Sequence, residues 1–112
     1  MKLSEVAKKL DLTAFAGEEM SDREISGGYC SDLLSDVMGN AAAGDLWITL
    51  QVHQNIIAVA ALKEVAAIVL VKGLKPATET IELSRKEGIP LFGTSATAFE
   101  IAGKLYQLLH EG

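Results

Sequence analysis

Residues 46–71 (LWITLQVHQNIIAVAALKEVAAIVLV) decide the fold class of this 112-residue chain. The segment begins with a short, largely apolar run, LWITL, which follows a turn signal at Gly44 and Asp45. It ends in the uninterrupted apolar run AAIVLV. Such a run, bounded by breaks, is typical of a strand that is covered on both faces. The helix-like residues between the two runs complete a β-α-β unit, which indicates a parallel sheet.

The same alternation continues toward the C-terminus. Residues 55–65 are predicted to form the helix of the first unit, and residues 89–92 (IPLF) a third strand. A helix is predicted for residues 76–87, because Pro76 stands at its first position and Gly88 follows its end. The expected last helix covers residues 96–110.

The N-terminal third is less regular. We expect a short helix capped by Ser4 and a second short helix capped by Ser31, since a serine hydroxyl can accept a hydrogen bond from a free backbone N–H. Between them, residues 24–30 are predicted to form an edge strand. Gly27 and Gly28 within this segment mark either a turn or a close backbone approach. This third of the chain is an expected α/β extension of the sheet.

The predicted fold is therefore α/β, a small and mostly parallel β-sheet flanked by helices, with a βαβαβα core, in one domain spanning residues 1–112. Apolar residues make up 49% of the chain and charged residues 22%, as in globular proteins. One cysteine, Cys30, excludes an internal disulfide and fits a reducing compartment. No apolar stretch has the length of a membrane span or the form of a signal peptide, so we expect a cytoplasmic protein without membrane contact.

The net charge of −5 argues against nucleic acid as the main partner, because phosphate binding requires a basic surplus. The last predicted helix carries two apolar stripes, more than one sheet face needs. One stripe contains Phe99, Ala102, Tyr106 and Leu109, and the other contains Ile101, Leu105 and Leu108. Surplus apolar surface usually marks an interface, and a homodimer is the simplest way to cover it.

Polar side chains follow the predicted strands, where open parallel sheets bind their ligands. Thr49, Gln51, His53 and Asn55 come after the first strand, and Thr94 and Ser95 after the third. One interpretation makes them the rim of a pocket for a small ligand, such as an anion, at a helix N-terminus. The alternative is structural, with Asn55 and either Thr94 or Ser95 capping helices and His53 donating to a backbone carbonyl.

Two carboxylates, Asp32 and Asp36, lie four positions apart with Ser35 between them. Paired carboxylates can hold a metal or transfer protons, but acids are also common in a solvated first helical turn. The chain lacks the usual zinc and calcium spacings, so no metal or other cofactor is expected. Cys30 with His53 or His110 as its base is weak evidence for covalent catalysis, because these residues lie far apart in the sequence.

Residues 31–38 (SDLLSDVM) and 46–60 (LWITLQVHQNIIAVA) resemble the DRTGG domain family, and residues 88–94 (GIPLFGT) continue the match. The resemblance extends over roughly residues 22–110. In the motif that names the family, Asp22-Arg23 and Gly27-Gly28 are present, but Glu24-Ile25-Ser26 stand in place of a lone threonine.

The resemblance implies a fold similar to the N-terminal domains of HPr kinase/phosphorylase and of the MurE and MurF ligases. It implies a regulatory or oligomerisation role without kinase activity, since the P-loop half of HPr kinase is missing. The positions to which it points as site residues are Asp32, Ser35, Asp36, Thr49, Gln51, His53, Asn55 and Thr94.

The leading hypothesis is a non-catalytic regulatory or sensing module, homodimeric, that binds a small ligand or a partner enzyme at the carboxyl ends of the strands. In the second hypothesis the chain is a pure interaction or oligomerisation domain, and its polar residues are caps and turns. The third is a cryptic enzyme that uses Asp32, Asp36 and His53.

Overall fold

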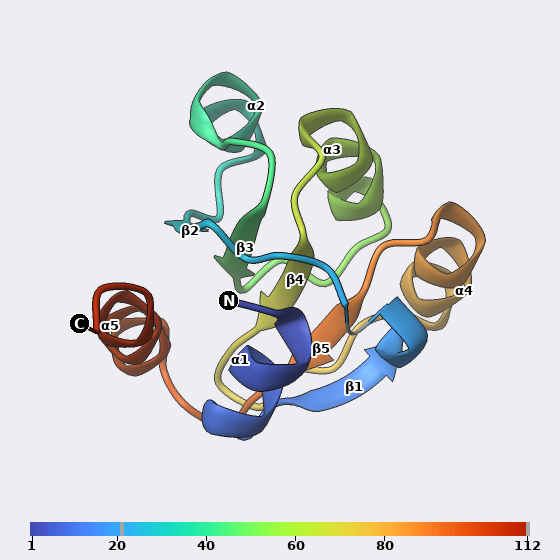
Figure 1. The fold of residues 1–112 in the computed structure, drawn as a ribbon. Helices are drawn as coiled ribbons and strands as arrows, with labels where there is room; N and C mark the ends of the chain where they lie inside the picture. Colours follow the sequence, from blue (N-terminus) through green and yellow to red (C-terminus); the bar gives the residue numbers. More distant parts are fainter. Residues whose placement is uncertain (21, 112) are drawn as a thin grey trace.

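In a computed structural model, which describes residues 1–20 and 22–111, helices and strands alternate along the chain (Figure 1). The strands are β1 (Thr13–Ala16), β2 (Gly27–Cys30), β3 (Asp45–Thr49), β4 (Ala67–Leu70) and β5 (Leu91–Gly93). The helices are α1 (Leu3–Lys9), α2 (Leu34–Asn40), α3 (Asn55–Lys63), α4 (Thr78–Glu87) and α5 (Ala98–Leu109), with a short 3₁₀ turn at Glu18–Met20.

The described strands form one sheet in the order β1-β5-β4-β3-β2. Strands β2 to β5 run parallel, with Trp47 opposite both Tyr29 of β2 and Ile68 of β4. Strand β1 pairs antiparallel with β5, so β1 and β2 are the two edges of the sheet. The prediction of a mostly parallel sheet with β2 at its edge is confirmed.

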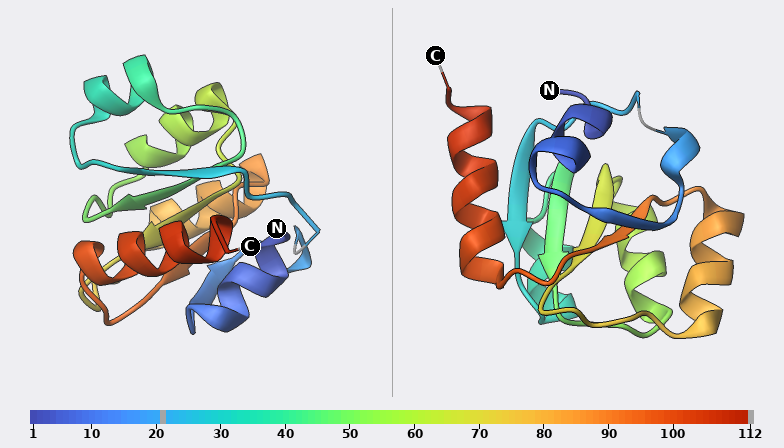
Figure 2. Two further views of the ribbon diagram at one scale, coloured as in Figure 1. Left: turned by 60° about the vertical axis from the view of Figure 1, so that its left-hand side comes forward. Right: turned by 90° about the horizontal axis from the view of Figure 1, so that it is seen from below.

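Helices cover both faces of the sheet, which gives three layers (Figures 1 and 2). Helices α1 and α5 cover one face, where Val6 and Leu105 meet the β3 residue Ile48 in one apolar cluster. Helices α2, α3 and α4 cover the other face, around the fully buried Trp47. Strands β3 and β4 are buried along their whole length, which explains the apolar runs at residues 46–48 and 67–70. The predicted α/β class is confirmed.

The expected strands at residues 46–50, 66–71 and 89–92 are present as β3, β4 and β5 with small shifts of their ends. Helix α3 stops at Lys63, earlier than predicted, because Glu64 adopts the left-handed conformation with φ of 56°. Helix α4 begins at Thr78 and not at Pro76. Ala77 is still extended, and its N–H donates to the carbonyl of Val52 at 3.3 Å.

The two serine caps predicted for the N-terminal third were wrong. Ser4 lies inside α1, which begins at Leu3, two residues before the start that a Ser4 cap implies, and the Leu3 N–H donates to the carbonyl of Arg23 at 2.7 Å. The hydroxyl of Ser31 accepts from the Leu33 N–H at 3.2 Å, which is a local turn before α2 starts at Leu34. In both places a contact outside the helix, or a turn, replaces the cap.

Strand β1 was not predicted. Its sequence, TAFA, is short and combines two residues that favour strands with two alanines that do not. Its position depends on pairing with β5, where Thr13 lies opposite Gly93. Phe15 packs over Gly93, since a Cβ on this glycine would lie 2.5 Å from the Phe15 ring. Among the described helices, none has both the length and the apolar character that crossing a membrane requires.

Candidate functional site

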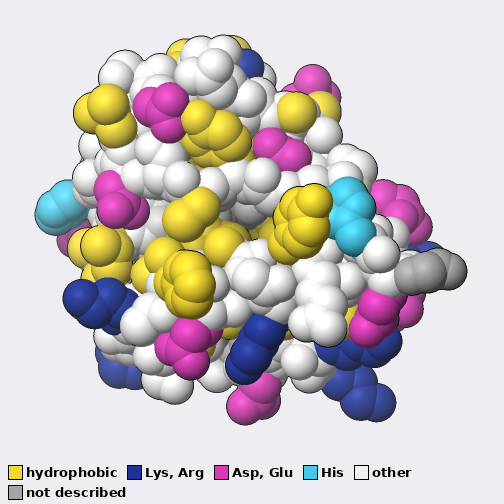
Figure 3. Space-filling model, turned by 90° about the vertical axis from the view of Figure 1, so that its left-hand side faces the viewer, with side chains coloured by type: hydrophobic (Ala, Val, Ile, Leu, Met, Phe, Trp, Pro, Cys, Tyr) yellow, Lys and Arg dark blue, Asp and Glu magenta, His cyan; other side chains and the backbone are white. Residues whose placement is uncertain are grey.

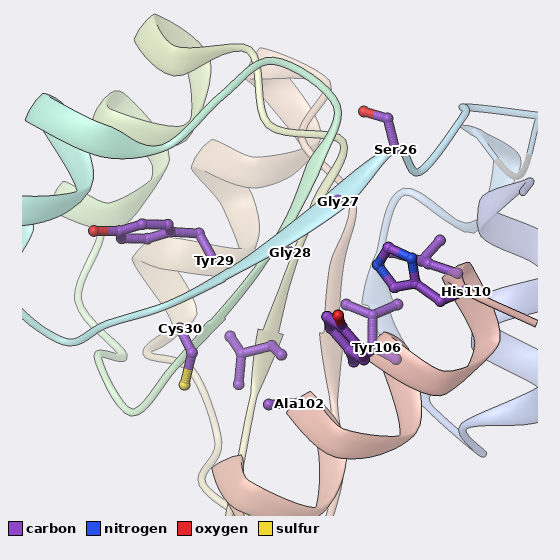
Figure 4. A pocket seen from close by; sticks show the side chains of 11 residues that line it. Ser26, Gly27, Gly28, Tyr29, Cys30, Ala102, Tyr106 and His110 are labelled. Atoms are coloured by element: carbon purple, nitrogen blue, oxygen red, sulfur yellow. The ribbon is translucent and has the colours of Figure 1, made fainter.

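A hollow lies between the edge strand β2 and helix α5 (Figure 4). Its volume is about 340 Å³, and we call it the β2–α5 groove. The residues that line it are Ser26, Gly27, Gly28, Tyr29, Cys30, Ile48, Ala102, Leu105, Tyr106, Leu109 and His110. Figure 2 shows α5 running beside β2 at this edge of the sheet.

Gly28 lets α5 approach the strand. A Cβ built on Gly28 would lie 2.7 Å from Cδ2 of Leu105, so a larger residue would require the Leu105 side chain to shift. Gly27 points to the opposite face, where its Cβ would lie 2.7 Å from Oδ1 of Asp45. Both glycines belong to β2 and form no turn. Of the two interpretations of this pair, the close backbone approach is therefore confirmed.

The groove is apolar along its length, with polar groups at its ends. Ile48 and Leu105 lie at its base. At one end the rings of Tyr106 and His110 are 4.3 Å apart, and at the other the Cys30 side chain points toward α5 (Figure 4). Its lining contains no lysine or arginine, so it suits an apolar or aromatic group better than a polyphosphate.

The Cys30 thiol has the wrong electrostatics for a nucleophile. Burial raises its pKa, and the nearby carboxylate of Asp32 raises the pKa further. A raised pKa keeps the sulfur protonated at neutral pH, whereas a nucleophilic cysteine needs a depressed one.

The outer side of α5 leaves a large apolar surface exposed. Ile101 and Leu105 of the second predicted stripe are buried, whereas Phe99 is 89% and Tyr106 68% exposed. The predicted surplus of apolar surface on this helix is thus present. Figure 3 shows apolar side chains at the centre of this face of the molecule, with charged side chains mostly toward its margins.

Three of the predicted site residues lie together at the carboxyl ends of β2 and β3. The hydroxyl of Thr49, itself buried, donates to Oδ1 of Asp32 at 2.9 Å. The amide of Gln51 donates to the Asp32 carbonyl oxygen at 2.9 Å. The N–H of Leu50 also donates to Oδ1 of Asp32, at 2.7 Å. This network ties the loop after β2 to the loop after β3.

His53, Asn55 and Ser35 are separate from this network, and all three are exposed. Their side chains make no hydrogen bond within the described part of the chain. The residue before α3 is Gln54, and no side chain caps this helix, so the expectation that Asn55 caps it was wrong. The expected bond from His53 to a backbone carbonyl is likewise not formed.

Asp36 faces a different partner from Asp32. The Tyr29 hydroxyl donates to Oδ2 of Asp36 at 2.8 Å, and the Asn40 amide donates to Oδ1 at 3.1 Å. The bond from Tyr29 lowers the pKa of Asp36, and the same bond raises the pKa of Tyr29. The two carboxylates therefore do not act as a pair, and the described residues hold no cluster of His, Cys, Asp and Glu side chains that fits a metal ion.

Thr94 and Ser95 follow β5 but do not cap the last helix. The Thr94 hydroxyl accepts from the Ala96 N–H at 3.2 Å, whereas Thr97 caps α5. The hydroxyl of Thr97 accepts from the Glu100 N–H at 3.2 Å, and the Glu100 carboxylate accepts from the Thr97 N–H at 3.0 Å. These bonds from Thr97, first that of its backbone N–H, lower the pKa of Glu100.

A small hollow of about 150 Å³ lies beside Thr94 and Ser95. It is also lined by Lys75 from the segment after β4 and by Phe15 of β1. Hydroxyls next to a lysine are groups that bind anions. The structure thus brings Thr94 and Ser95 to a lysine that the sequence analysis did not single out.

The groove itself was not predicted as a site, although two signals pointed to parts of it. The glycine pair indicated a close approach, and the apolar stripe of α5 with Ala102, Tyr106 and Leu109 forms one of its walls. What the sequence does not contain is the pairing of these two segments, which lie far apart along the chain.

Arg23, from the motif resembling that of the DRTGG family, ties together the ends of two helices. Its guanidinium donates to the carbonyl of Gly88, which ends α4, at 2.9 Å. It also donates to the carbonyls of Val65 and Ala66, between α3 and β4, at 3.4 Å each. The basic residue of the motif thus connects the segment between α3 and β4 to the end of α4.

Comparison with known proteins agrees with this architecture. The structure is similar to the crystal structure of the CBS and DRTGG domains of the regulatory region of Clostridium perfringens pyrophosphatase, complexed with its activator diadenosine tetraphosphate. The TM-score is 0.70 at 19% sequence identity, over 94% of this chain and 46% of that chain. The fold is DRTGG-like. The expected resemblance is confirmed at the level of the fold.

The present chain spans less than half the length of the pyrophosphatase regulatory region that it matches. No family model matches the sequence, and neither does any curated protein. The similarity is therefore one of three-dimensional structure, and DRTGG-like is used below in that sense.

Proposed function

We propose that this DRTGG-like chain is a regulatory module, without catalytic activity of its own, that acts as a homodimer through the face formed by β2 and α5. Residues 1–112 form the module as one domain, and we place it in the cytoplasm, with no role in binding nucleic acid or membranes. The observation that carries the proposal is the apolar β2–α5 groove beside the exposed Phe99 and Tyr106. Exposed apolar surface of this kind marks an interface.

The arrangement of polar groups also favours a binding role over catalysis. Thr49, Asp32 and Gln51 satisfy one another, and His53 is exposed and apart from them. The cryptic enzyme considered from the sequence would need His53 beside Asp32 and Asp36. The similar pyrophosphatase structure belongs to a regulatory region, which supports the same conclusion.

A second function, response to a small anionic ligand, is favoured by the hollow beside β5. Lys75, Thr94 and Ser95 line it at the carboxyl ends of β4 and β5, where parallel sheets bind ligands. The activator in the pyrophosphatase structure, diadenosine tetraphosphate, carries phosphates. We propose that a phosphate-containing ligand would bind here and not in the β2–α5 groove, since the groove has no lysine or arginine.

Thr94 and Ser95 are the residues proposed for this hollow. The other ligand-binding positions proposed from the sequence lie elsewhere and would contribute outside it: Thr49, Gln51, His53, Asn55, Asp32, Ser35 and Asp36. The hydrogen-bonded residues among them would hold the loops in position, and the exposed ones would meet the ligand or a partner enzyme. A pure interaction domain without a ligand is the alternative, and it would use the same homodimer face.

Native mass spectrometry of gently purified protein tests both functions at once. The expected species is a dimer, and a small molecule bound at the strand ends would add its mass. A thermal-shift series with inorganic phosphate and ATP, on wild type and the Lys75→Ala variant, then tests the second function. A monomer over the whole accessible concentration range would overturn the homodimer, and equal shifts in both proteins would overturn the anion site.

A further inference from the structure

The exposed side of α5 carries a seam with an ordered arrangement of side chains. We call Phe99, Ala102, Gly103, Tyr106 and His110 the α5 seam. Their spacing of three and four residues places them on one stripe of a helix with 3.6 residues per turn. Large rings stand at both ends of the seam and small residues at its middle. The rings of Phe99 and Tyr106 are mostly exposed to solvent.

Gly103 has no explanation within the chain. A glycine inside a helix weakens that helix relative to alanine. A Cβ at this position would meet no atom within 4 Å, so no neighbour in the chain requires its absence. Its φ is not positive either. A residue without a side chain at the middle of an exposed seam allows another helix to approach closely, because interhelical distance depends on the side chains at the contact.

The order of the seam fits a second copy of itself. In a dimer with two-fold symmetry the same surface lies on both subunits, so the surface must be complementary to its own reverse. Small residues at the centre with rings on each side meet this condition. Phe99 lies about 5 Å along the helix axis from the centre between Ala102 and Gly103, and Tyr106 about 5 Å on the other side, at a rise of 1.5 Å per residue.

Building on the proposed homodimer, we infer that α5 pairs antiparallel with α5 of a second copy and crosses it at Ala102 and Gly103. The Phe99 ring of each copy then enters the β2–α5 groove of the other, beside Tyr106. The binding site is therefore complete only in the dimer, because each copy supplies the ring that fills the groove of its partner.

Three observations favour a second copy as the occupant. The groove is apolar and is large enough for a phenyl ring, at about 340 Å³. The seam contains no acid, although the chain carries a net charge of −5, so like charges do not oppose contact there. Two aromatic residues bury about 150–250 Å² each, so the two rings alone supply roughly half of the about 800 Å² per partner of a stable interface.

Sedimentation equilibrium on three proteins tests this arrangement. Gly103→Leu fills the crossing point, and we expect it to weaken dimerisation by about 100-fold or more, the scale of an interface hot spot. Gly39→Leu is the matched control, because Gly39 is an exposed glycine of α2 that also has no atom within 4 Å of a Cβ. The control should dimerise as wild type does. Circular dichroism confirms that both variants are folded.

Phe99→Ala and a cross-link complete the test. Phe99→Ala should weaken the dimer as strongly as Gly103→Leu, since it empties the groove of both copies. Ala102→Cys in a Cys30→Ser background should form an intermolecular disulfide on oxidation, because Cα atoms at the crossing lie within the roughly 4.4–6.8 Å that a disulfide spans.

The outcomes separate this inference from the proposed function. A wild-type dimer that Gly103→Leu leaves intact, or in which Ala102→Cys forms no disulfide, overturns the α5 arrangement and leaves the homodimer standing. A wild-type monomer overturns both. A small molecule found in the groove of a monomer would give the groove a different occupant and would also refute the arrangement.

Discussion

Replacing Arg23 by alanine is the sharpest test of how the motif residues work. The guanidinium donates to three backbone carbonyls, at 2.9 Å to Gly88 and at 3.4 Å to Val65 and Ala66. These carbonyls stand where α3 and α4 end, and a cation near helix C-termini is favourable. Removal of Arg23 therefore takes a charged donor away from three carbonyl groups.

The loss of stability expected for Arg23→Ala follows from the hydrogen bond that Gly88 accepts from a charged donor. Such a bond contributes roughly 1.5–3 kcal/mol, and the two longer bonds add a smaller amount. We expect Arg23→Ala to lower the free energy of unfolding by about 2–3 kcal/mol. For a chain of this length each kcal/mol shifts Tm by roughly 4 °C, so Tm should fall by roughly 8–12 °C. Urea and thermal unfolding followed by circular dichroism measure both quantities.

Arg85→Ala provides the matched control. Arg85 is exposed, and its guanidinium makes a single long bond of 3.5 Å to the carbonyl of Phe15. Its removal should change the free energy of unfolding by no more than about 0.5 kcal/mol. Arg23→Lys should fall between the two, because one ammonium cannot reach all three carbonyls in the geometry of the planar fork. Equal losses for Arg23→Ala and Arg85→Ala would refute a structural role for Arg23.

Three further changes address β2 and the contacts of the residues around it. Thr49→Val should cost about 1 kcal/mol in urea unfolding, because it removes the bond to Asp32 at nearly constant volume, and an unchanged midpoint would contradict the network. Gly28→Ala should cost roughly 1–3 kcal/mol by calorimetry through its clash with Leu105, and a stabilised variant would show that α5 moves freely. The lowered pKa of Asp36 contributes stability above its ordinary value of about 3.9, which is lost as the pH falls through the lower pKa of the folded state. Asp36→Asn should therefore flatten the acid limb of the stability curve, and a parallel curve would contradict the pairing with Tyr29.

Much of the fold is predictable from the sequence because burial on both faces restricts which residues the central strands can contain. Strands β3 and β4 are covered on both faces, so their residues are apolar except for Asp45 and Thr49 at the two ends of β3, and this pattern is visible without the structure. Gly88 ends α4 as expected because its φ of 69° favours glycine. These features depend on neighbours close in the sequence or on burial alone.

The sequence-based predictions that failed concern features that depend on contacts between distant segments. Strand β1 forms because β5 has a free edge with which it pairs, and its four residues are too few and too mixed in β preference to predict a strand. Ser4 and Ser31 have the side chains of helix caps, but a hydrogen bond from Leu3 to Arg23 and a local turn at Leu33 determine where the two helices begin. The preference of a serine for the N-cap position is only about 1 kcal/mol, so such contacts can outweigh it.

For the candidate site, the sequence predicts which residues are polar but not which of them meet. Thr49, Gln51 and Asp32 come together because parallel strands end at the same edge. The spacing of Asp32 and Asp36 suggested a carboxylate pair, yet Asp32 precedes α2 and its carboxylate turns toward β3. That difference cannot be inferred from spacing, because it depends on where α2 begins.

The two apolar stripes of α5 show most clearly what the chain alone leaves open. Both stripes have the period of a helix, so either could face the sheet. The choice falls on the stripe of Ile101 and Leu105 because Gly28 leaves room for Leu105 above β2. The stripe with Phe99 and Tyr106 is then turned to solvent at the edge of the sheet. A missing side chain on an edge strand thus determines which apolar surface remains available for a second molecule.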